Sequence, residues 1–297
     1  MDTSVESLVT YLRRPITVRQ IQNMPQTASL RAAYGTHPGQ LRDINQDNVL
    51  SLIRPQKMGQ ALGLLVVADG MGGHKAGEVA SRLAVETIRE SLAWMLEQDD
   101  AQATVMVGNP GGEDNALERR LRRAIEEANQ VIYAYSKENK KDAGNLGCTV
   151  TCVLVNGSRA VVANVGDSRT YLYRGQELQQ ITEDHSYVWQ LVQEGFLKVE
   201  EIYDHPQRNV ITRALGNQEE VAVDTWTYTL EDGDRLLLCS DGVWEMIHNP
   251  DEIAASLANE ELQEAVNQLI EAANNYGGLD NIGVVVAEYQ APTAEQA

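Results

Sequence analysis

The sequence predicts an α+β fold in which antiparallel sheets and helices form layers. Strand-rich and helix-rich blocks alternate without the regular strand–helix–strand order of a parallel sheet. Several apolar runs are short, β-branched and bounded by Gly, Pro or polar clusters, which is typical of buried strands. Four of these runs have an aspartate at one end: Asp47 before 48–53, Asp69 after 62–68, Asp241 after 235–240, and Asp280 before 282–289.

Two of these aspartates leave a strand and two enter one. If neighbouring strands are antiparallel, strand exits and strand entries lie at the same edge of the sheet. We therefore expect the four carboxylates to converge. Because carboxylates repel one another unless a cation neutralises them, this arrangement predicts a metal cluster.

The predicted elements follow in order along the chain. Residues 1–30 are expected to form an extension with a helix, because Thr3 and Glu6 have the spacing of a capping box and apolar residues follow at helical spacing. This basic segment either docks on the acidic body of the protein or serves as a partner-binding or autoregulatory arm. The expected strands are 48–53, 62–68, 148–155, 160–165, 169–173, 177–181, 221–229, 235–240 and 282–289. The expected helices are 77–96, 115–140 and 259–275, and residues 291–297 form a tail.

Composition excludes several classes of partner. The chain has 24 Lys and Arg against 43 Asp and Glu, a net charge of −19, which argues against binding to nucleic acid or to an anionic membrane surface. Cys148, Cys152 and Cys239 lack the spacing of a redox or zinc pair, so they are expected to be buried thiols. We expect no signal peptide, and no apolar run in the sequence has membrane length. We expect a cytoplasmic protein that is a monomer.

The most informative motif is ADGMGGHKAGEVAS at 68–81, where an aspartate leaves a strand and enters a glycine-rich loop. It matches neither phosphate-binding pattern, GxxxxGK[ST] or GxGxxG, so a metal-binding turn is the better interpretation, with a tight strand-to-helix turn as the alternative. The segment LRDINQDN at 41–48 places Arg42 five residues before Asp47. A guanidinium beside a carboxylate-bound metal is suited to bidentate capture of a phosphate.

Seven motifs in this order resemble the metal-dependent protein phosphatases, the type 2C Ser/Thr phosphatases: LRDINQD, VVADGMGGH, GCTVT, ANVGDSR, RNVITRALG, LLLCSDG and GGLDN. The resemblance covers roughly residues 30–290, and the DGMGGH form is similar to the bacterial branch. It implies a four-layer αββα sandwich with two central antiparallel sheets flanked by helix pairs. It also implies a catalytic domain at 31–290 with a flap at about 182–215, next to the active site.

The resemblance assigns a role to individual residues. Asp69 is expected to bridge two metals, with the carbonyl of Gly70 as a further ligand. Asp241 and Asp280 are expected to ligate one metal, and Asp47 to hold the other through water.

Three further positions follow from the same resemblance. Arg42 is expected to bind the substrate phosphate, and Asp167 to form a looser third metal site together with Asp241. Other members have a histidine directly after Asp-Gly as the proposed proton donor, whereas this chain has Met71 there. His74 is the nearest titratable side chain, so it is a candidate acid, with shaping of the loop as the alternative.

The chemistry of these ligands agrees with the resemblance. Oxygen ligands without His or Cys suit Mg²⁺ or Mn²⁺ rather than zinc. Two such ions lower the pKa of a bridging water, which then attacks phosphorus in line, with Asp69 and Asp241 as the central ligands and without a covalent intermediate. Ser168 and Ser240 are therefore expected to be structural.

The predicted function is Ser/Thr phosphoprotein phosphatase in bacterial signal transduction, acting on targets of a Ser/Thr kinase. Two alternatives remain open from the sequence. One is a catalytically weak member of the same fold that binds phosphoproteins, and the other is a hydrolase of small phosphomonoesters.

Overall fold

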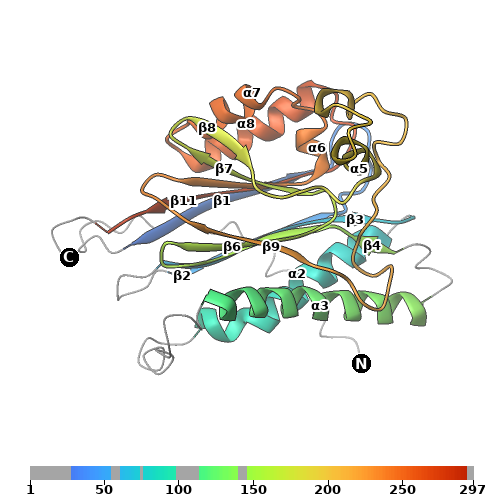
Figure 1. Ribbon diagram of the computed structural model, residues 1–297, viewed down its shortest axis with the longest axis horizontal. Coiled ribbons are helices and arrows are strands. Elements are labelled where there is room, and N and C mark those ends of the chain that lie inside the picture. The colour runs from blue at the N-terminus through green and yellow to red at the C-terminus, as the bar shows by residue number, and fades with distance from the viewer. Residues whose placement is uncertain (1–27, 55–60, 74–75, 98–113, 140–145, 293–297) are drawn as a thin grey trace.

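The computed structural model describes residues 28–54, 61–73, 76–97, 114–139 and 146–292. In these residues two antiparallel sheets lie face to face, and helices cover their outer faces (Figure 1). The five-stranded sheet has the order β1-β11-β10-β7-β8. Its strands are β1 (Ser29–His37), β7 (Arg169–Arg174), β8 (Glu177–Gln180), β10 (Arg235–Cys239) and β11 (Ile282–Gln290).

The six-stranded sheet has the order β2-β3-β5-β6-β9, with β4 paired to the end of β3. Its strands are β2 (Asp47–Arg54), β3 (Leu62–Met71), β4 (Gly147–Cys148), β5 (Val150–Asn156), β6 (Arg159–Val165) and β9 (Asp224–Thr229). The predicted antiparallel pairing is therefore present in both sheets.

Two long helices, α2 (Ala76–Glu97) and α3 (Asp114–Glu138), cover the six-stranded sheet. The five-stranded sheet is covered by α7 (Pro250–Leu257) and α8 (Leu262–Asn275). The short α6 (Asp241–Trp244) follows β10 directly. This is the αββα sandwich that the resemblance implied.

Strand β3 shows why the central strands are apolar throughout. Leu64 and Val66 pack towards α2 and α3, whereas Leu65 and Val67 pack against the other sheet. All four side chains are fully buried. A strand buried on both faces has no need of alternating polar residues.

Some sequence-based expectations were wrong. The strand β1 was not expected, and neither was α7, which begins at Pro250 after the N-cap Asn249. The helix expected at 259–275 is α8, which begins at Leu262. Phe196, in the segment predicted as a flap, is 76% exposed and lies outside the core. The helix expected at 1–30 lies almost entirely in residues 1–27, outside the described residues.

The segment predicted as a flap contains α5 (Tyr187–Gln193) and a 3₁₀ turn, η2 (Val199–Glu201). The N-cap of α5 is Ser186. The Ser186 hydroxyl accepts a hydrogen bond from the Trp189 N–H. None of the described helices has both the length and the apolarity required to cross a membrane.

Candidate metal centre

Five aspartates lie at one edge of the two sheets. Asp47 and Asp69 stand directly opposite each other in the ladder between β2 and β3. Asp241 follows β10 and Asp280 precedes β11, which are antiparallel neighbours, and Asp167 lies in the turn between β6 and β7. The structure thus brings together the four carboxylates predicted from the strand ends, and Asp167 with them.

The carboxylates affect one another's ionisation. Burial raises the pKa of Asp69 well above its usual value, and the charges of Asp241 and Asp47 raise it further. The pKa of Asp241 is also raised, first by burial and then by the charges of Asp167 and Asp280. Burial is likewise the largest cause of the rise in the pKa of Asp167, to about 7. Such a cluster is stabilised by cations, which favour the charged form of every member.

The donor set fits divalent ions that prefer oxygen ligands. One carboxylate oxygen of Asp47 and one of Asp167 are buried without a hydrogen-bond partner, which leaves them available to a cation. Among the described residues, however, no three His, Cys, Asp or Glu side chains already form a group able to hold one ion. Joint ligation of an ion therefore requires rotation of the aspartate side chains.

Glycine is required at position 70 by the close approach of two backbone segments. A Cβ atom on Gly70 would lie 2.1 Å from the carbonyl oxygen of Gly77 and 2.8 Å from that of Gln46. The Gly70 N–H donates to the same Gln46 carbonyl, at 3.2 Å. The start of α2 and the segment before Asp47 are thereby held against the residue that follows Asp69.

Asp47 is oriented by Ser240. The Ser240 hydroxyl donates to Asp47 Oδ2 at 2.6 Å and accepts from the Gly283 N–H at 2.8 Å. Burial raises the pKa of Asp47 to about 7; the Ser240 hydrogen bond opposes this rise, and the charge of Asp280 adds to it. The expectation that Ser240 is structural agrees with these contacts, although its specific link to Asp47 was not foreseen.

Asn281 holds the loop that carries Arg42. Its Nδ2 donates to the carbonyls of Pro38 and Ile44, at 3.0 and 2.9 Å, and its Oδ1 accepts from the Gln46 N–H at 2.8 Å. A Cβ atom on Gly242 would lie 2.0 Å from the Asn281 carbonyl oxygen, so α6 also packs tightly against this residue. Asn281 is the last residue of the motif GGLDN, and no role for it was predicted from the sequence.

Arg42 reaches the centre from this loop. Its Nη2 lies 2.6 Å from Asp280 Oδ2, and its side chain is 53% exposed. An exposed guanidinium at the edge of the acidic cluster can bind an anionic group that approaches from solvent.

The turn that bears Asp167 is supported by a buried cation. Trp244 Nε1 donates to the Asp167 carbonyl at 3.0 Å, and the guanidinium of Arg169 lies 3.5 Å from the centroid of the Trp244 ring. Arg169 in turn pairs with Asp184 at 2.6 Å, and both side chains are at most 5% exposed. The Arg169 charge is thus already matched by Asp184, which leaves the Asp167 carboxylate to other partners.

Neither a serine nor a cysteine next to the centre is suited to be a nucleophile. Ser168 is fully buried, and its hydroxyl is bonded to that of Thr149 at 2.7 Å. Burial raises the pKa of the Cys239 thiol, which therefore stays protonated. The candidate acid His74 lies outside the described residues.

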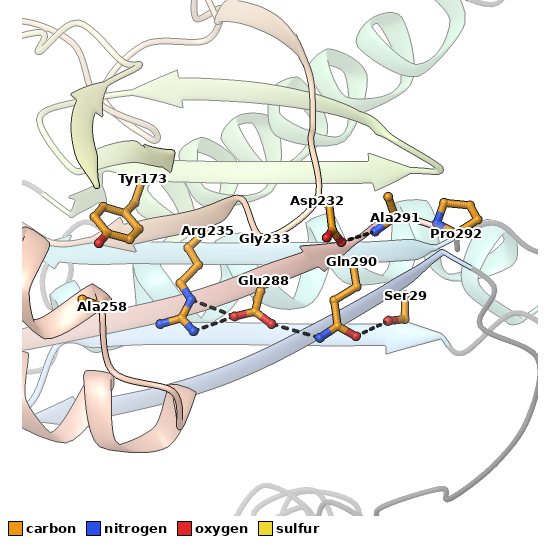
Figure 2. A pocket seen from close by; sticks show the side chains of 10 residues that line it. All are labelled: Ser29, Tyr173, Asp232, Gly233, Arg235, Ala258, Glu288, Gln290, Ala291 and Pro292. Carbon is orange, nitrogen blue, oxygen red and sulfur yellow. Dashed lines mark hydrogen bonds and ion pairs between the residues drawn. The ribbon is translucent and has the colours of Figure 1, made fainter. Parts of the chain in front are cut away.

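A hollow of about 630 Å³ lies at the opposite end of the five-stranded sheet (Figure 2). It is lined by Glu288 and Gln290 at the end of β11, whereas Asp280 stands before the start of that strand. Nine residues of strand separate the two ends, a distance of roughly 27 Å. The acidic cluster and this hollow are therefore separate places.

The comparison with known proteins bears directly on this cluster. A family model described as protein phosphatase 2C matches residues 36–277. The serine/threonine phosphatase stp of Listeria monocytogenes is 37% identical over 259 residues, which span 87% of this chain and 96% of that protein. The chain belongs to the protein phosphatase 2C family.

Solved structures agree with this family. The crystal structure of the Mycobacterium tuberculosis phosphatase PstP/Ppp is similar with a TM-score of 0.73 at 38% identity, covering 88% of this chain and 99% of that one. A structure of the PstP catalytic domain in complex with two manganese ions has a TM-score of 0.73 at 36% identity, covering 89% and 100% of the two chains.

The chain is accordingly a metal-dependent phosphatase of phosphoserine and phosphothreonine in proteins, similar to those of bacteria. Its cofactors are Mg²⁺ or Mn²⁺. The predictions of family, fold, enzyme class and cofactor are confirmed.

Proposed function

We propose that Asp69, Asp241 and Asp280, with Asp47 and the Gly70 carbonyl, are the groups through which this chain holds two divalent cations for phosphoester hydrolysis. The observation that carries the assignment is the convergence of these carboxylates from separate strand ends, with mutual charge effects on Asp69. The unpartnered oxygen of Asp167 supports a looser third site shared with Asp241.

The chain's own residues then have distinct tasks. When bound, the ions activate a water for attack on phosphorus and neutralise charge on the phosphoryl oxygens. Ser240 keeps Asp47 in one orientation, and Asn281 keeps the Arg42 loop against the centre. Arg42 donates to the phosphate oxygens of the substrate, exchanging its present partner Asp280 for the anion.

Removal of metal tests the assignment. Turnover of p-nitrophenyl phosphate and of a phosphoserine peptide is expected to vanish in EDTA and to return with Mn²⁺, because oxygen ligand sets bind such ions only moderately. Undiminished turnover after thorough chelation would contradict the two-metal assignment.

His74 is proposed as the proton donor to the leaving hydroxyl, in place of the histidine that Met71 replaces. His74→Ala is then expected to slow phosphoserine hydrolysis by up to ~10²-fold and to spare p-nitrophenyl phosphate, whose leaving group needs little protonation. Equal slowing of both substrates would indicate that His74 supports the loop instead.

The remaining proposals concern context. We propose a catalytic domain at 31–290 with a flap at 182–215, flanked by an N-terminal extension and a tail, that acts as a cytoplasmic monomer on targets of a Ser/Thr kinase. Phosphatase names among the relatives support protein substrates. Sedimentation of the purified chain tests the monomer, and incubation with kinase-labelled cell extract tests the substrates.

A further inference from the structure

A second hollow, of about 400 Å³, borders the metal centre on the side of the flap. Three segments enclose it: the end of the flap, the connection from α6 into α7, and the turn after α8. Its lining includes Tyr203, Arg208, Glu245, Glu252, Tyr276 and Leu279.

Two residues that line the hollow are adjacent to proposed ligands. Leu279 directly precedes Asp280, and the Glu245 N–H donates to the Asp241 carbonyl at 2.8 Å. Successive residues of an extended peptide are about 3.5 Å apart. A phosphorylated residue at the metal centre therefore brings one of its sequence neighbours to this hollow.

The walls offer apolar and aromatic surface to a long side chain. Leu279 is 43% exposed and Tyr276 is 56% exposed. The lining also includes Tyr203 and His248, whose rings are stacked with 3.9 Å between centroids. Such surfaces accept the aliphatic stem of a Lys or Arg side chain, and an aromatic face also attracts its cation.

The charges of the lining favour a cation. Two carboxylates, Glu245 and Glu252, face one guanidinium, Arg208. Arg208 Nε is 3.7 Å from Glu245 Oε2, beyond hydrogen-bond length. Glu252 accepts from the Tyr276 hydroxyl at 2.8 Å. A carboxylate has about four lone-pair sites, so Glu252 retains acceptor capacity for a charged donor.

We propose that this hollow is the subsite for a basic side chain, Arg or Lys, that neighbours the phosphorylated residue in the protein substrate. The stem of that side chain lies along Tyr276 and Leu279, and its cation binds Glu252. An acidic neighbour is repelled by the same two carboxylates. This inference rests on the proposed function, since it requires the phosphate to be bound at the aspartate cluster.

The test is the ratio of the kcat/KM values that one protein shows for two peptides. Two sets of phosphoserine peptides, varied on the N-terminal or the C-terminal side, carry Arg, Ala or Glu near the phosphoserine. The full chain is loaded with Mn²⁺, and kcat/KM is measured for each. In at least one set, kcat/KM for the Arg peptide is expected to be about tenfold higher than for the Ala peptide. A tenfold difference corresponds to the contribution of about one charge-assisted hydrogen bond.

Variants of the protein show which residues cause the preference for the Arg peptide. Glu252→Gln is expected to bring the Arg-to-Ala ratio close to one, whereas Glu271→Gln, which removes a charge from an exposed position of α8 outside the hollow, is expected to keep it. A general loss of activity cancels in the ratio. If Glu252→Gln fails to fold, Tyr276→Ala provides the same test, because it removes the aromatic wall.

The outcomes separate the two proposals. A wild-type ratio near one in both sets, or a ratio that Glu252→Gln and Tyr276→Ala leave unchanged, overturns the subsite and leaves the metal centre intact. An equal fall with Glu271→Gln also overturns it, because the preference then reflects the overall charge of −19. A wild type that hydrolyses no peptide with Mn²⁺ overturns the proposed function and the subsite with it.

Discussion

Buried carboxylates are paired with arginines at one end of the five-stranded sheet and cluster with one another at the end that carries Asp241 and Asp280. At the far end, Arg31 and Arg235 stand directly opposite Glu288 on the two neighbouring strands, and each pairs with it at 2.6 Å. Although burial acts against it, the hydrogen bonds from these arginines lower the pKa of Glu288. At the other end, the carboxylates gather mainly with one another, and their pKa values rise.

The difference shows what each end is for. Matched charges at the far end lock three strands together in a fixed register. Unmatched charges at the site edge oppose folding to some extent, and binding of cations relieves this repulsion. The proposed metal centre therefore lowers the stability of the metal-free protein. Four substitutions test this contrast.

Removal of Asp69 is expected to have the largest effect. Metal ions contribute several kcal/mol to the transition state, so Asp69→Ala is expected to lower kcat by ~10³-fold or more. The unfolding midpoint in EDTA is expected to stay the same or to rise, because repulsion within the cluster falls. Asp232→Ala, at the far end of the sheet, serves as the control for turnover. Near-wild-type turnover of Asp69→Ala would contradict the assignment.

The pH dependence of stability comes next in size. The pKa of Asp167 is raised from 3.8 to about 7 in the folded state, so the stability gained from its neutral form is complete below pH 3.8 and is lost as pH rises through 7. Asp167→Asn avoids that loss. In EDTA, its advantage in unfolding free energy over the wild type is expected to grow by about 4 kcal/mol between pH 4 and 8. Urea unfolding at several pH values measures this difference, and parallel curves for the two proteins would refute it.

Glu288→Gln is the matching change at the far end. It leaves the Arg235 guanidinium, only 10% exposed, without its carboxylate. We expect a loss of about 3 kcal/mol in unfolding free energy. Turnover with Mn²⁺ below the unfolding transition is expected to be unaffected. Arg31→Ala is the milder companion, because Arg31 is 49% exposed and its pair contributes less than about 1 kcal/mol. Equal destabilisation by both changes would show that burial does not set the strength of these pairs.

Arg42→Ala is expected to have the smallest effect of the four. Loss of a charge-assisted contact costs about 1.5–3 kcal/mol, mostly as a higher KM for phosphorylated substrate. Thermal unfolding is expected to change little, because the pair with Asp280 is exposed. Arg42→Lys keeps the positive charge but lacks the planar guanidinium, so its KM is expected to lie between those of the wild type and Arg42→Ala. Steady-state kinetics on a phosphopeptide measures the effect, and an unchanged KM in a folded variant would identify Arg42 as a surface residue.

Local sequence predicted the site because strand ends are visible in the apolar pattern. Antiparallel pairing places Asp47 opposite Asp69 in one sheet and Asp241 near Asp280 in the other, and the face-to-face packing of the two sheets then brings the two pairs together. The roles of Ser240 and Asn281 could not be predicted in this way. Each bonds a residue about two hundred or more positions earlier, and no local pattern records such a contact.

Two elements, α7 and β1, were missed in the predicted fold, one despite a local signal and the other because it forms through a non-local contact. The start of α7 carried a usable signal, since Asn249 caps the helix and Pro250 occupies its first turn, but it was not recognised. Strand β1 has little local signal of a strand, because apolar and polar residues alternate only weakly in SLRAAYGTH and the segment includes a glycine. It becomes a strand through pairing with β11, which lies at the other end of the chain.

That pairing also determines when the aspartate cluster can be completed during synthesis of the chain. Of the described strands β11 is the last to be synthesised, yet it lies between β1 and β10 and begins two residues after Asp280. The strands β2, β3, β5 and β6 are neighbours both in the chain and in their sheet, so they can pair earlier. A nascent or prematurely terminated chain therefore exposes two open strand edges, which invite aggregation, and lacks an aspartate of its centre. The five-stranded sheet, and with it the aspartate cluster at its edge, can be completed only after β11 has been synthesised.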